Sequence, residues 1–373
     1  MLTIVYVVDY LSIRTGGPRF LMNVFSKLVK TGKFRVFVVT GQVVGKTLIT
    51  DENIDIVNLN AYSENRLPHE QPLRAIKFAM KSRFTIKQLV KHEDSILHTN
   101  SHLPNLLPFL TRVDVPVVCS IHHLESLHCA HTFIGKLGIA FLQDLLELNT
   151  KCSVVHVPSN HIKSLIQQKS IINKHNIAVI PPGIDTRKYF AIPRNPSNGL
   201  FVMIGRLERR KHYVHAITAF KIVARHRPHY KLVIIGDGPL KHELIRLIKR
   251  YGLERNVFLL GSVDEETKLE LLSKAEALIH LGYPEGFGIV ILEALASGTP
   301  VIAYDVPPIN EVVKNGVTGI LVEKDNIIEL ARAIMSINRY YFDLKTLRHY
   351  AERYDIKIIA KKFETVYCSL AVK

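Results

Sequence analysis

Several features are scarce in this chain of 373 residues, and their scarcity narrows the class of protein. No apolar run reaches the roughly 18 residues that a membrane-spanning helix needs. The four cysteines are Cys119, Cys129, Cys152 and Cys368, and none of them stands in CxxC spacing. We therefore expect neither a zinc site nor a disulfide framework. Cys119 and Cys152 fall in strand-like runs, where we expect free thiols that pack as small apolar side chains.

Complete cofactor motifs are also lacking. Neither Thr15-Gly16-Gly17-Pro18 nor Gly236-Asp237-Gly238 completes GxGxxG, because Lys241 stands where the last glycine of the second motif would be, so a nicotinamide dinucleotide site is unsupported. No lysine motif for pyridoxal phosphate is found, and no internal repeat occurs. The first ten residues have no basic n-region and no small-residue cleavage site, which predicts a strand and not a signal peptide. We therefore expect a cytoplasmic protein.

The composition that remains is that of a globular protein with a basic surface. Apolar residues make up 47% of the chain and charged residues 22%, and a chain of this length predicts two domains. The net charge of +16 favours polyanionic partners. Between Gln71 and His92 there are six basic residues and no acidic one, but the apolar residues do not gather on one clean face. This segment is either a helix that lies on a membrane or an ordinary solvated basic helix.

Apolar runs rich in β-branched residues alternate with helical patterns along the whole chain, which predicts parallel sheets with crossover helices. In the first half the predicted strands are Leu2–Val8, Arg35–Thr40, Asp55–Leu59, Ser95–His98, Pro116–Ile121, Val154–Val157 and Ile177–Ile180. The helices predicted there are Arg19–Val29, Leu73–Lys91, Phe133–Leu148 and Asn160–Gln168. In the second half the predicted strands are Leu200–Ile204, Lys231–Ile235, Val257–Leu260, Ala277–His280, Pro300–Ala303 and Gly319–Val322. The helices there are Val214–Ala224, Leu240–Tyr251, Glu265–Ser273, Phe287–Ala296 and Ile327–Ile337.

The best linker is Ala191–Gly199, which is rich in proline, asparagine and glycine. It separates a predicted first domain, residues 1–190, from a second, residues 200–350. A C-terminal helix at about 355–373 is expected to pack back on the first domain. The fold class is α/β, with two facing doubly wound domains. Ligands are expected at the carboxyl ends of the strands, in the cleft between the domains.

Two glutamates separated by seven residues, Glu285 and Glu293, are the most informative feature. Glu285 precedes the turn Gly286-Phe287-Gly288, and Glu293 falls about two turns into the predicted apolar helix. A carboxylate in such a helix is costly unless it is hydrogen-bonded. The helix start is a natural seat for phosphate. Two acceptors beside such a seat suit a sugar nucleotide, although a surface turn residue and an ordinary polar helix residue are the alternative.

Cations follow the first strand of the second domain. Arg206 and Lys211 lie at its carboxyl end, where an arginine fork and a lysine can bind a diphosphate. Fixed cations lower the barrier when a diphosphate leaves. A solvated basic loop is the alternative. In the first domain Gly17 precedes a helix, and His122 follows a strand, where it can hydrogen-bond a substrate; both also fit purely structural roles.

Taken together, these segments resemble the family-four retaining glycosyltransferases of GT-B fold. The pattern EGFGxxxLEAxAxGxPVxA is present at Glu285–Ala303, and GRLxxxK at Gly205–Lys211. Further matches, in the family's order, are PPGID at Pro181–Asp185, GDGP at Gly236–Pro239, LGxV at Leu260–Val263 and NGxTGxLV at Asn315–Val322. Most of the second domain is covered, whereas the first matches at few positions.

The resemblance implies a role for each motif residue. Arg206 and Lys211 would hold the diphosphate, Glu293 the ribose hydroxyls, and the backbone near Val263 the base. The donor sugar would be held by Glu285 with the backbone of Gly286, Phe287, Gly288 and Ile289. Gly17 would contact the phosphates from the first domain, and His122 would approach the sugar. The catalytic set is then Glu285, His122, Arg206 and Lys211. Family members transfer a sugar with retention and need neither a metal nor another cofactor.

The expected partners are a nucleotide-sugar donor and an acceptor that is a lipid, a glycan or another molecule, with peripheral contact to the inner membrane face through the basic first domain. Nucleic acid is not an expected partner. The chain departs from the family where His212 replaces a glycine and Leu281-Gly282 replaces Pro-Ser, which puts donor preference in doubt. The alternatives are a GT-B epimerase or phosphorylase, and a catalytically silent relative whose basic surface binds membrane or nucleic acid.

Overall fold

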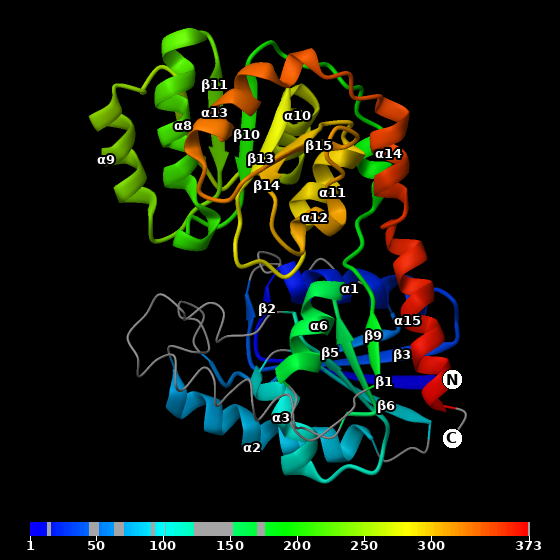
Figure 1. The fold of residues 1–373 in the computed structure, drawn as a ribbon. Coiled ribbons are helices and arrows are strands. Elements are labelled where there is room, and N and C mark those ends of the chain that lie inside the picture. The colour runs from blue at the N-terminus through cyan, green and yellow to red at the C-terminus, as the bar shows by residue number, and fades with distance from the viewer. Residues whose placement is uncertain are drawn as a thin grey trace. The chain divides into compact units, whose positions relative to one another are not determined.

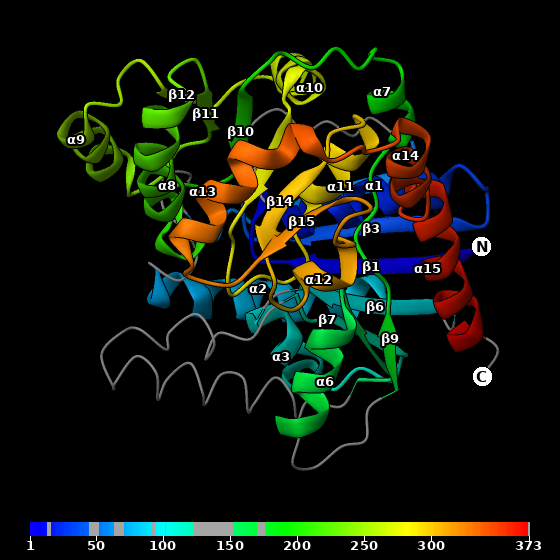
Figure 2. The ribbon, with the colours of Figure 1, turned by 45° about the horizontal axis from the view of Figure 1, so that its top comes forward.

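The computed structural model describes residues 1–12, 16–44, 52–62, 71–90, 94–100, 102–122, 152–169 and 176–371. The chain forms two compact units. The first comprises Met1–Gly183 and Ile356–Lys373, and the second Ile184–Asp355. In each unit helices pack beside a central parallel sheet (Figures 1 and 2). The predicted helix Phe133–Leu148 and Cys129 lie outside the described residues.

The sheet of the first unit has seven parallel strands in the order β5-β3-β1-β6-β7-β8-β9. They are β1 (Leu2–Val8), β3 (Phe34–Thr40), β5 (Ile54–Asn58), β6 (Ser95–Asn100), β7 (Val117–Ser120), β8 (Val154–Val157) and β9 (Ile177–Val179), with β2 (Leu11–Ser12) and β4 (Val43–Val44) as a separate pair. The helices are α1 (Gly16–Val29), α2 (Pro72–Leu89), α3 (His102–Thr111), α6 (Asn160–Lys169) and α15 (Ile356–Ala371). Residues 4–8 of β1 are buried, as expected for a parallel strand covered on both faces.

The C-terminal helix α15 is part of the first unit. The hydroxyl of Tyr367 lies 2.6 Å from Nδ1 of His98 on β6, and Lys33 and Glu364 form an ion pair at 2.8 Å. The ring of Phe363 packs on Phe20 of α1, with centroids 6.0 Å apart. A buried hydrogen bond, an ion pair and an aromatic contact therefore hold α15 on the first unit.

The sheet of the second unit has six parallel strands in the order β12-β11-β10-β13-β14-β15. They are β10 (Leu200–Ile204), β11 (Lys231–Ile235), β12 (Val257–Gly261), β13 (Ala277–His280), β14 (Val301–Tyr304) and β15 (Gly319–Val322). The helices are α7 (Thr186–Phe190), α8 (Tyr213–His226), α9 (Lys241–Tyr251), α10 (Glu265–Lys274), α11 (Ile289–Ala296), α12 (Ile309–Val312), α13 (Ile327–Ser336) and α14 (Leu344–Glu352), with short 3-10 turns η3 (Arg209–Lys211) and η4 (Ile337–Arg339). The order of strands reverses between β10 and β13, which makes their carboxyl ends the expected ligand position.

Local sequence signals explain where several of these helices start and stop. Asp264 caps α10 by accepting a hydrogen bond from the backbone N–H of Thr267 at 2.7 Å. Asn326 caps α13 in the same way through the N–H of Glu329 at 3.0 Å. The helix α9 ends at Tyr251, and Gly252 follows it with a φ of +66°, a common helix-terminating conformation.

The structure corrects two expectations. The stretch Ala191–Gly199 is not the boundary between the units. It belongs to the second unit, where the N–H groups of Asn195 and Ser197 bond the carbonyls of Ser273 and Lys274. The boundary falls earlier, between Gly183 and Ile184.

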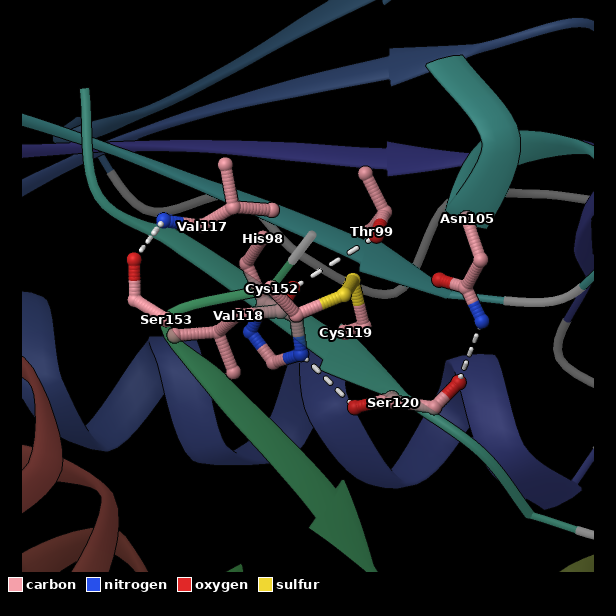
Figure 3. The surroundings of a disulfide bond; sticks show 9 residues. All are labelled: His98, Thr99, Asn105, Val117, Val118, Cys119, Ser120, Cys152 and Ser153. Carbon is pink, nitrogen blue, oxygen red and sulfur yellow. Dashed lines mark hydrogen bonds between the residues drawn. A yellow bond between two sulfur atoms is a disulfide. The ribbon is translucent and has the colours of Figure 1, made fainter. Parts of the chain in front are cut away.

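Cys119 and Cys152 are also not free thiols, because the structure joins them in a disulfide with Cα atoms 6.0 Å apart (Figure 3). Cys119 lies on β7, and Cys152 lies two residues before the first residue of the neighbouring strand β8. Pairing of adjacent strands brings together two cysteines that lie 33 positions apart in the sequence, where no short motif connects them. Ser153 strengthens the same junction by accepting a hydrogen bond from the N–H of Val117 at 3.0 Å. None of the described helices is long and apolar enough to cross a membrane.

Candidate functional site

Two loops meet at the point where the strand order of the second unit reverses. Residues 205–211 follow β10, and residues 281–288 follow β13. Because β10 and β13 are parallel neighbours, both loops leave the same edge of the sheet. The N–H of Tyr283 donates to the carbonyl of Arg210 at 2.8 Å, and Nδ1 of His212 donates to the carbonyl of Leu281 at 2.9 Å. These two hydrogen bonds therefore join the loops into one structure.

Glu285 lies at the centre of this structure between two cations. Nζ of Lys211 is in direct ion-pair contact with Oε2 of Glu285, and Nη1 of Arg210 lies 3.3 Å from the same oxygen. Only 14% of the Glu285 side chain is exposed. Burial raises the pKa of this carboxyl, but Lys211 and Arg210 outweigh burial and hold the pKa well below its usual range. Glu285 is therefore a fixed anion with its hydrogen-bond donors in place.

His280, the last residue of β13, completes the surroundings of Glu285. Its side chain is 3% exposed, and its Nε2 lies 3.9 Å from Oε2 of Glu285. Burial first, and then the charge of Lys211, lower the pKa of His280 to about 3, against the raising effect of Glu285. The ring is therefore neutral at pH 7. Within the described parts of the chain no group hydrogen-bonds its Nε2.

Two glycines make room for this arrangement. A Cβ on Gly282 would lie 2.8 Å from Oε2 of Glu285 and 3.1 Å from Nε2 of His280. Gly288 has φ +87°, and a Cβ there would lie 3.3 Å from the same nitrogen. The chain has Leu281-Gly282 where the family commonly has Pro-Ser, and the structure gives a physical reason for the glycine. A larger residue at position 282 would displace the Glu285 carboxylate.

The second glutamate, Glu293, belongs to a separate ion-pair cluster. Its Oε1 lies 2.8 Å from Nζ of Lys268 on α10, and the same nitrogen lies 3.0 Å from Glu265. The helix α11 starts at Ile289 and not at the predicted Phe287, because the left-handed backbone of Gly288 caps it. Glu293 therefore lies about one turn into the helix, closer to the unsatisfied N–H groups of its first turn than the sequence predicted.

Of the three cations Arg206, Arg210 and Lys211, Arg206 is the most exposed, with 52% of its side chain accessible. Its Nε lies 2.9 Å from Oε1 of Glu208, and Nε of Arg210 lies 3.0 Å from Oε2 of the same residue. Arg206, Arg210 and Lys211 are thus interleaved with Glu208 and Glu285. Three cations against two carboxylates leave a net positive edge, which can bind a diphosphate.

The other second-unit residues that we predicted to bind the donor would contact it through their backbone atoms. Val263 turns a partly buried side chain into the core beside Ile235 and Ala275. Phe287 is buried, with its ring 5.6 Å from that of Tyr354. Gly286 and Ile289 are partly buried, and Ile289 begins α11.

Gly17 and His122 belong to the first unit, whereas the other predicted site residues belong to the second. Gly17 is the second residue of α1, and His122 follows β7, so both lie at the carboxyl edge of the first sheet. The ring of His122 meets that of His156 edge-on, with centroids 5.9 Å apart.

Sequence reasoning missed four residues of these clusters, namely Glu208, Arg210, Lys268 and His280. The run Glu208–Lys211 signals only a charged loop, and His280 is one of 18 histidines. Lys268 carries no signal at all, since its ion pairs depend on how α10 packs beside α11.

Two family models divide the chain between them. Glycosyl transferases group 1 matches residues 185–354, and glycosyltransferase family 4 matches residues 14–188. Between them the two models span residues 14–354, and both are models of glycosyltransferases. This match confirms the predicted family, and the predicted GT-B class with two Rossmann-like domains is confirmed as well.

Individual proteins resemble the chain to different extents. Glycogen synthase of Mycobacterium tuberculosis is 33% identical over 163 residues, which are 43% of this chain and 39% of that protein, so the chain spans about two fifths of its length. An uncharacterised glycosyltransferase of Methanocaldococcus jannaschii is 28% identical over 87% of both chains. Among solved structures, Anabaena HepE in complex with UDP-glucose superimposes with a TM-score of 0.77 over 99% of this chain and all of that one, at 21% identity. At that identity the likeness shows the fold.

Proposed function

We propose that this protein is a glycosyltransferase that moves a monosaccharide from a nucleotide-sugar donor to an acceptor with retention of the anomeric configuration. The observation that carries the proposal is the cluster of Lys211, Arg210 and Glu285 where the strand order of the second unit reverses. A diphosphate needs fixed cations, and a sugar needs a fixed carboxylate acceptor. This edge of the sheet offers both.

In the proposed reaction the bond between the anomeric carbon of the sugar and the donor phosphate oxygen breaks. The leaving nucleoside diphosphate takes the electron pair, and Arg206 and Lys211 stabilise its growing negative charge. A hydroxyl oxygen of the acceptor bonds to the anomeric carbon on the same face, and its proton passes to a donor phosphate oxygen. Glu285 orients the sugar, and the family resemblance assigns a further sugar contact to His122. The cations take the place of a metal, and no other cofactor takes part.

Nucleotide binding in this proposal uses the second cluster. Lys268 contacts Oε1 of Glu293, and the ribose hydroxyls donate to Oε2. The backbone near Val263 contacts the base. A uridine diphosphate sugar is the first donor to test, because the solved HepE complex contains UDP-glucose.

The helix α2 supports a membrane-borne acceptor. Leu73, Ile76, Met80 and Phe84 are 82%, 60%, 70% and 67% exposed. Steps of three and four residues place these four side chains on one face of the helix. A contiguous apolar face on a protein surface marks an interaction site.

The opposite face of α2 explains why the sequence pattern was ambiguous. Phe78, Ser82 and Ile86 are fully buried in the first unit. The helix therefore has one apolar face in the core and another in solvent. A helix with two apolar faces does not show the single apolar stripe of an amphipathic pattern. Five basic residues and no acidic one complete α2, among them Lys77 and Lys87 beside the exposed face. An exposed apolar face bordered by lysines suits a surface of anionic lipid.

The experiment that tests the proposed function is release of nucleoside diphosphate by the purified protein from a panel of nucleotide sugars, with and without lipid acceptors. Acceptor-dependent release that survives EDTA supports the proposal. An epimerase would instead interconvert sugar nucleotides without an acceptor, and a silent relative would release nothing above background. Strict dependence on Mg²⁺ would contradict the metal-free mechanism.

A further inference from the structure

A group of metal-ligand side chains lies beside the donor loops and has no part in the proposed reaction. One ligand atom from each of His212, His215 and Asp325 lies within 4.8 Å of the others. His212 joins η3 to α8, His215 is in the first turn of α8, and Asp325 lies between β15 and α13. We propose that these three residues bind a divalent transition-metal ion, with Zn²⁺ as the best-suited ion.

The chemistry of the group fits such an ion. Imidazole nitrogens and a carboxylate are common zinc ligands, and three protein ligands leave a position for water. Hard cations such as Mg²⁺ prefer oxygen ligands and suit this set poorly. The two histidine side chains are partly shielded from solvent, whereas Asp325 is 54% exposed, so the ion has an open route to the site.

The hydrogen bond of His212 to Leu281 leaves its other ring nitrogen as the candidate ligand atom. Its Nδ1 donates a hydrogen bond to the carbonyl of Leu281 at 2.9 Å, and a carbonyl can only accept. The lone pair of His212 is therefore on Nε2. Histidines that bind metals commonly donate their other ring N–H to a backbone carbonyl, which fixes the ring.

His215 and Asp325 face one another at a distance that an ion can bridge. Nδ1 of His215 lies 3.6 Å from Oδ1 of Asp325, while the other carboxylate oxygen pairs with Lys324 at 3.0 Å. Two ligands each about 2.0–2.1 Å from a tetrahedral zinc are roughly 3.3 Å apart, so this pair needs to close by only a few tenths of an ångström. Nδ1 of His215 is also hydrogen-bonded to the hydroxyl of Tyr304 at 2.6 Å, so a metal on this nitrogen would replace that hydrogen bond and move the hydroxyl aside.

The backbone at two of the three residues is unusual. His212 has φ +50° and Asp325 has φ +65°, and only two other non-glycine residues in the described ranges share a positive φ. Such conformations are costly and tend to persist at functional positions. The side-chain geometry carries the proposal.

The location gives the ion a structural effect on the donor site. His212 directly follows Lys211, and its hydrogen bond to Leu281 links the loops that carry Lys211 and Glu285. A metal on His212 would stiffen this link without contacting the reacting atoms. Transfer therefore continues without the ion, and the bound ion raises stability by mass action.

The test is Zn²⁺ binding to the untagged, chelator-stripped full chain, measured by competition with a chromophoric chelator, with Co²⁺ absorption as a second probe. We expect the wild type to bind one equivalent more than the double variant His215→Gln/Asp325→Asn, to show the absorption of four-coordinate Co²⁺, and to gain several degrees in melting temperature with Zn²⁺. The variant His226→Gln, which changes an exposed histidine at the end of α8, should behave as the wild type.

Equal zinc stoichiometry and equal melting shifts in the wild type and the double variant would overturn the proposal, as would wild-type binding no tighter than millimolar. Circular dichroism of the double variant shows whether it is folded, and His212→Ala supplies a second variant if it is not. No donor or acceptor is present in these measurements, so their outcome does not depend on the proposed transferase activity.

Discussion

Nζ of Lys268 lies 2.8 Å from Oε1 of Glu293, and these two side chains are only 11% and 14% exposed. The pair joins α10 to α11 and accounts for a carboxylate in an otherwise apolar helix, since a buried charge needs a partner. The contact fixes the direction of the Glu293 side chain.

From this fixed direction we predict that Glu293→Gln weakens binding of a nucleoside diphosphate by about 10- to 100-fold, because a hydrogen bond to a charged group contributes about 1.5–3 kcal/mol. Isothermal titration with UDP measures the change. Glu266→Gln, on the exposed side of α10, is the matched control and should bind as the wild type does. Equal affinity in the Glu293 variant would remove this residue from the nucleotide site.

Lys211 and Glu285 are in direct contact, but substitutions of the two residues should impair different properties, namely nucleotide binding and turnover. Lys211→Ala should weaken UDP binding by about 10- to 100-fold, because it removes a charge-assisted bond to the diphosphate. Glu285→Gln should lower kcat by about 100-fold or more while UDP affinity stays within a few-fold, because the carboxylate holds the sugar. Titration calorimetry and steady-state kinetics separate the two effects.

The control for both variants is Lys221→Ala, which removes a lysine that packs on Tyr251 away from the site. Lys211→Ala should also lower the free energy of unfolding, because it takes one of two cations from a carboxylate that is 14% exposed. Wild-type turnover by Glu285→Gln would refute its role.

Stability should depend on pH through His280. Burial lowers the folded-state pKa of His280 to about 3, whereas its unfolded value is about 6.5. The neutral ring therefore contributes stability that is complete above about pH 6.5 and is lost as the pH falls towards 3. Each pH unit in this window costs about 1.4 kcal/mol, so the loss between pH 7 and pH 5 is about 2 kcal/mol.

Urea unfolding of the wild type and His280→Gln at pH 7, 6 and 5 measures this contribution. The variant should lose about 2 kcal/mol less than the wild type over this range. The buried His98 and His156 titrate in both proteins, so their contributions cancel in the comparison. Parallel curves for the two proteins would show that His280 is not held neutral by the fold.

The exposed face of α2 should bind anionic membranes. We expect the wild type to sediment with phosphatidylglycerol vesicles and much less with phosphatidylcholine vesicles, and salt should weaken the association. The double variant Ile76→Ser/Phe84→Ser should lose most of the binding, because it removes two of the four exposed apolar side chains. Tyr341→Ser, at an 87% exposed position in the second unit, is the control. Equal sedimentation of all variants would mean that lipid binds elsewhere.

The sheets were predictable from sequence because parallel buried strands are short apolar runs bounded by turns. The predicted bounds of β10, β11, β13 and β15 coincide with the observed ones. The helix α3 was not predicted, because Pro104 and Pro108 argue against a helix that its packing nevertheless stabilises.

What the sequence could not supply is the partner of each charge. Glu285 and Glu293 were found by their spacing and by family resemblance, but Arg210, Lys268 and His280 reach them only through tertiary packing. The Cys119–Cys152 disulfide was missed for the same reason, since strand pairing brings the two residues together. The sequence therefore predicts where the candidate site lies, and the structure identifies the groups that set the charge there.

The most direct measurement is a crystal structure of the protein with a nucleotide sugar that the activity panel identifies. The proposed function requires the diphosphate within hydrogen-bonding distance of Arg206 and Lys211, the ribose on Glu293 and the sugar on Glu285. A diphosphate bound away from these cations would contradict it.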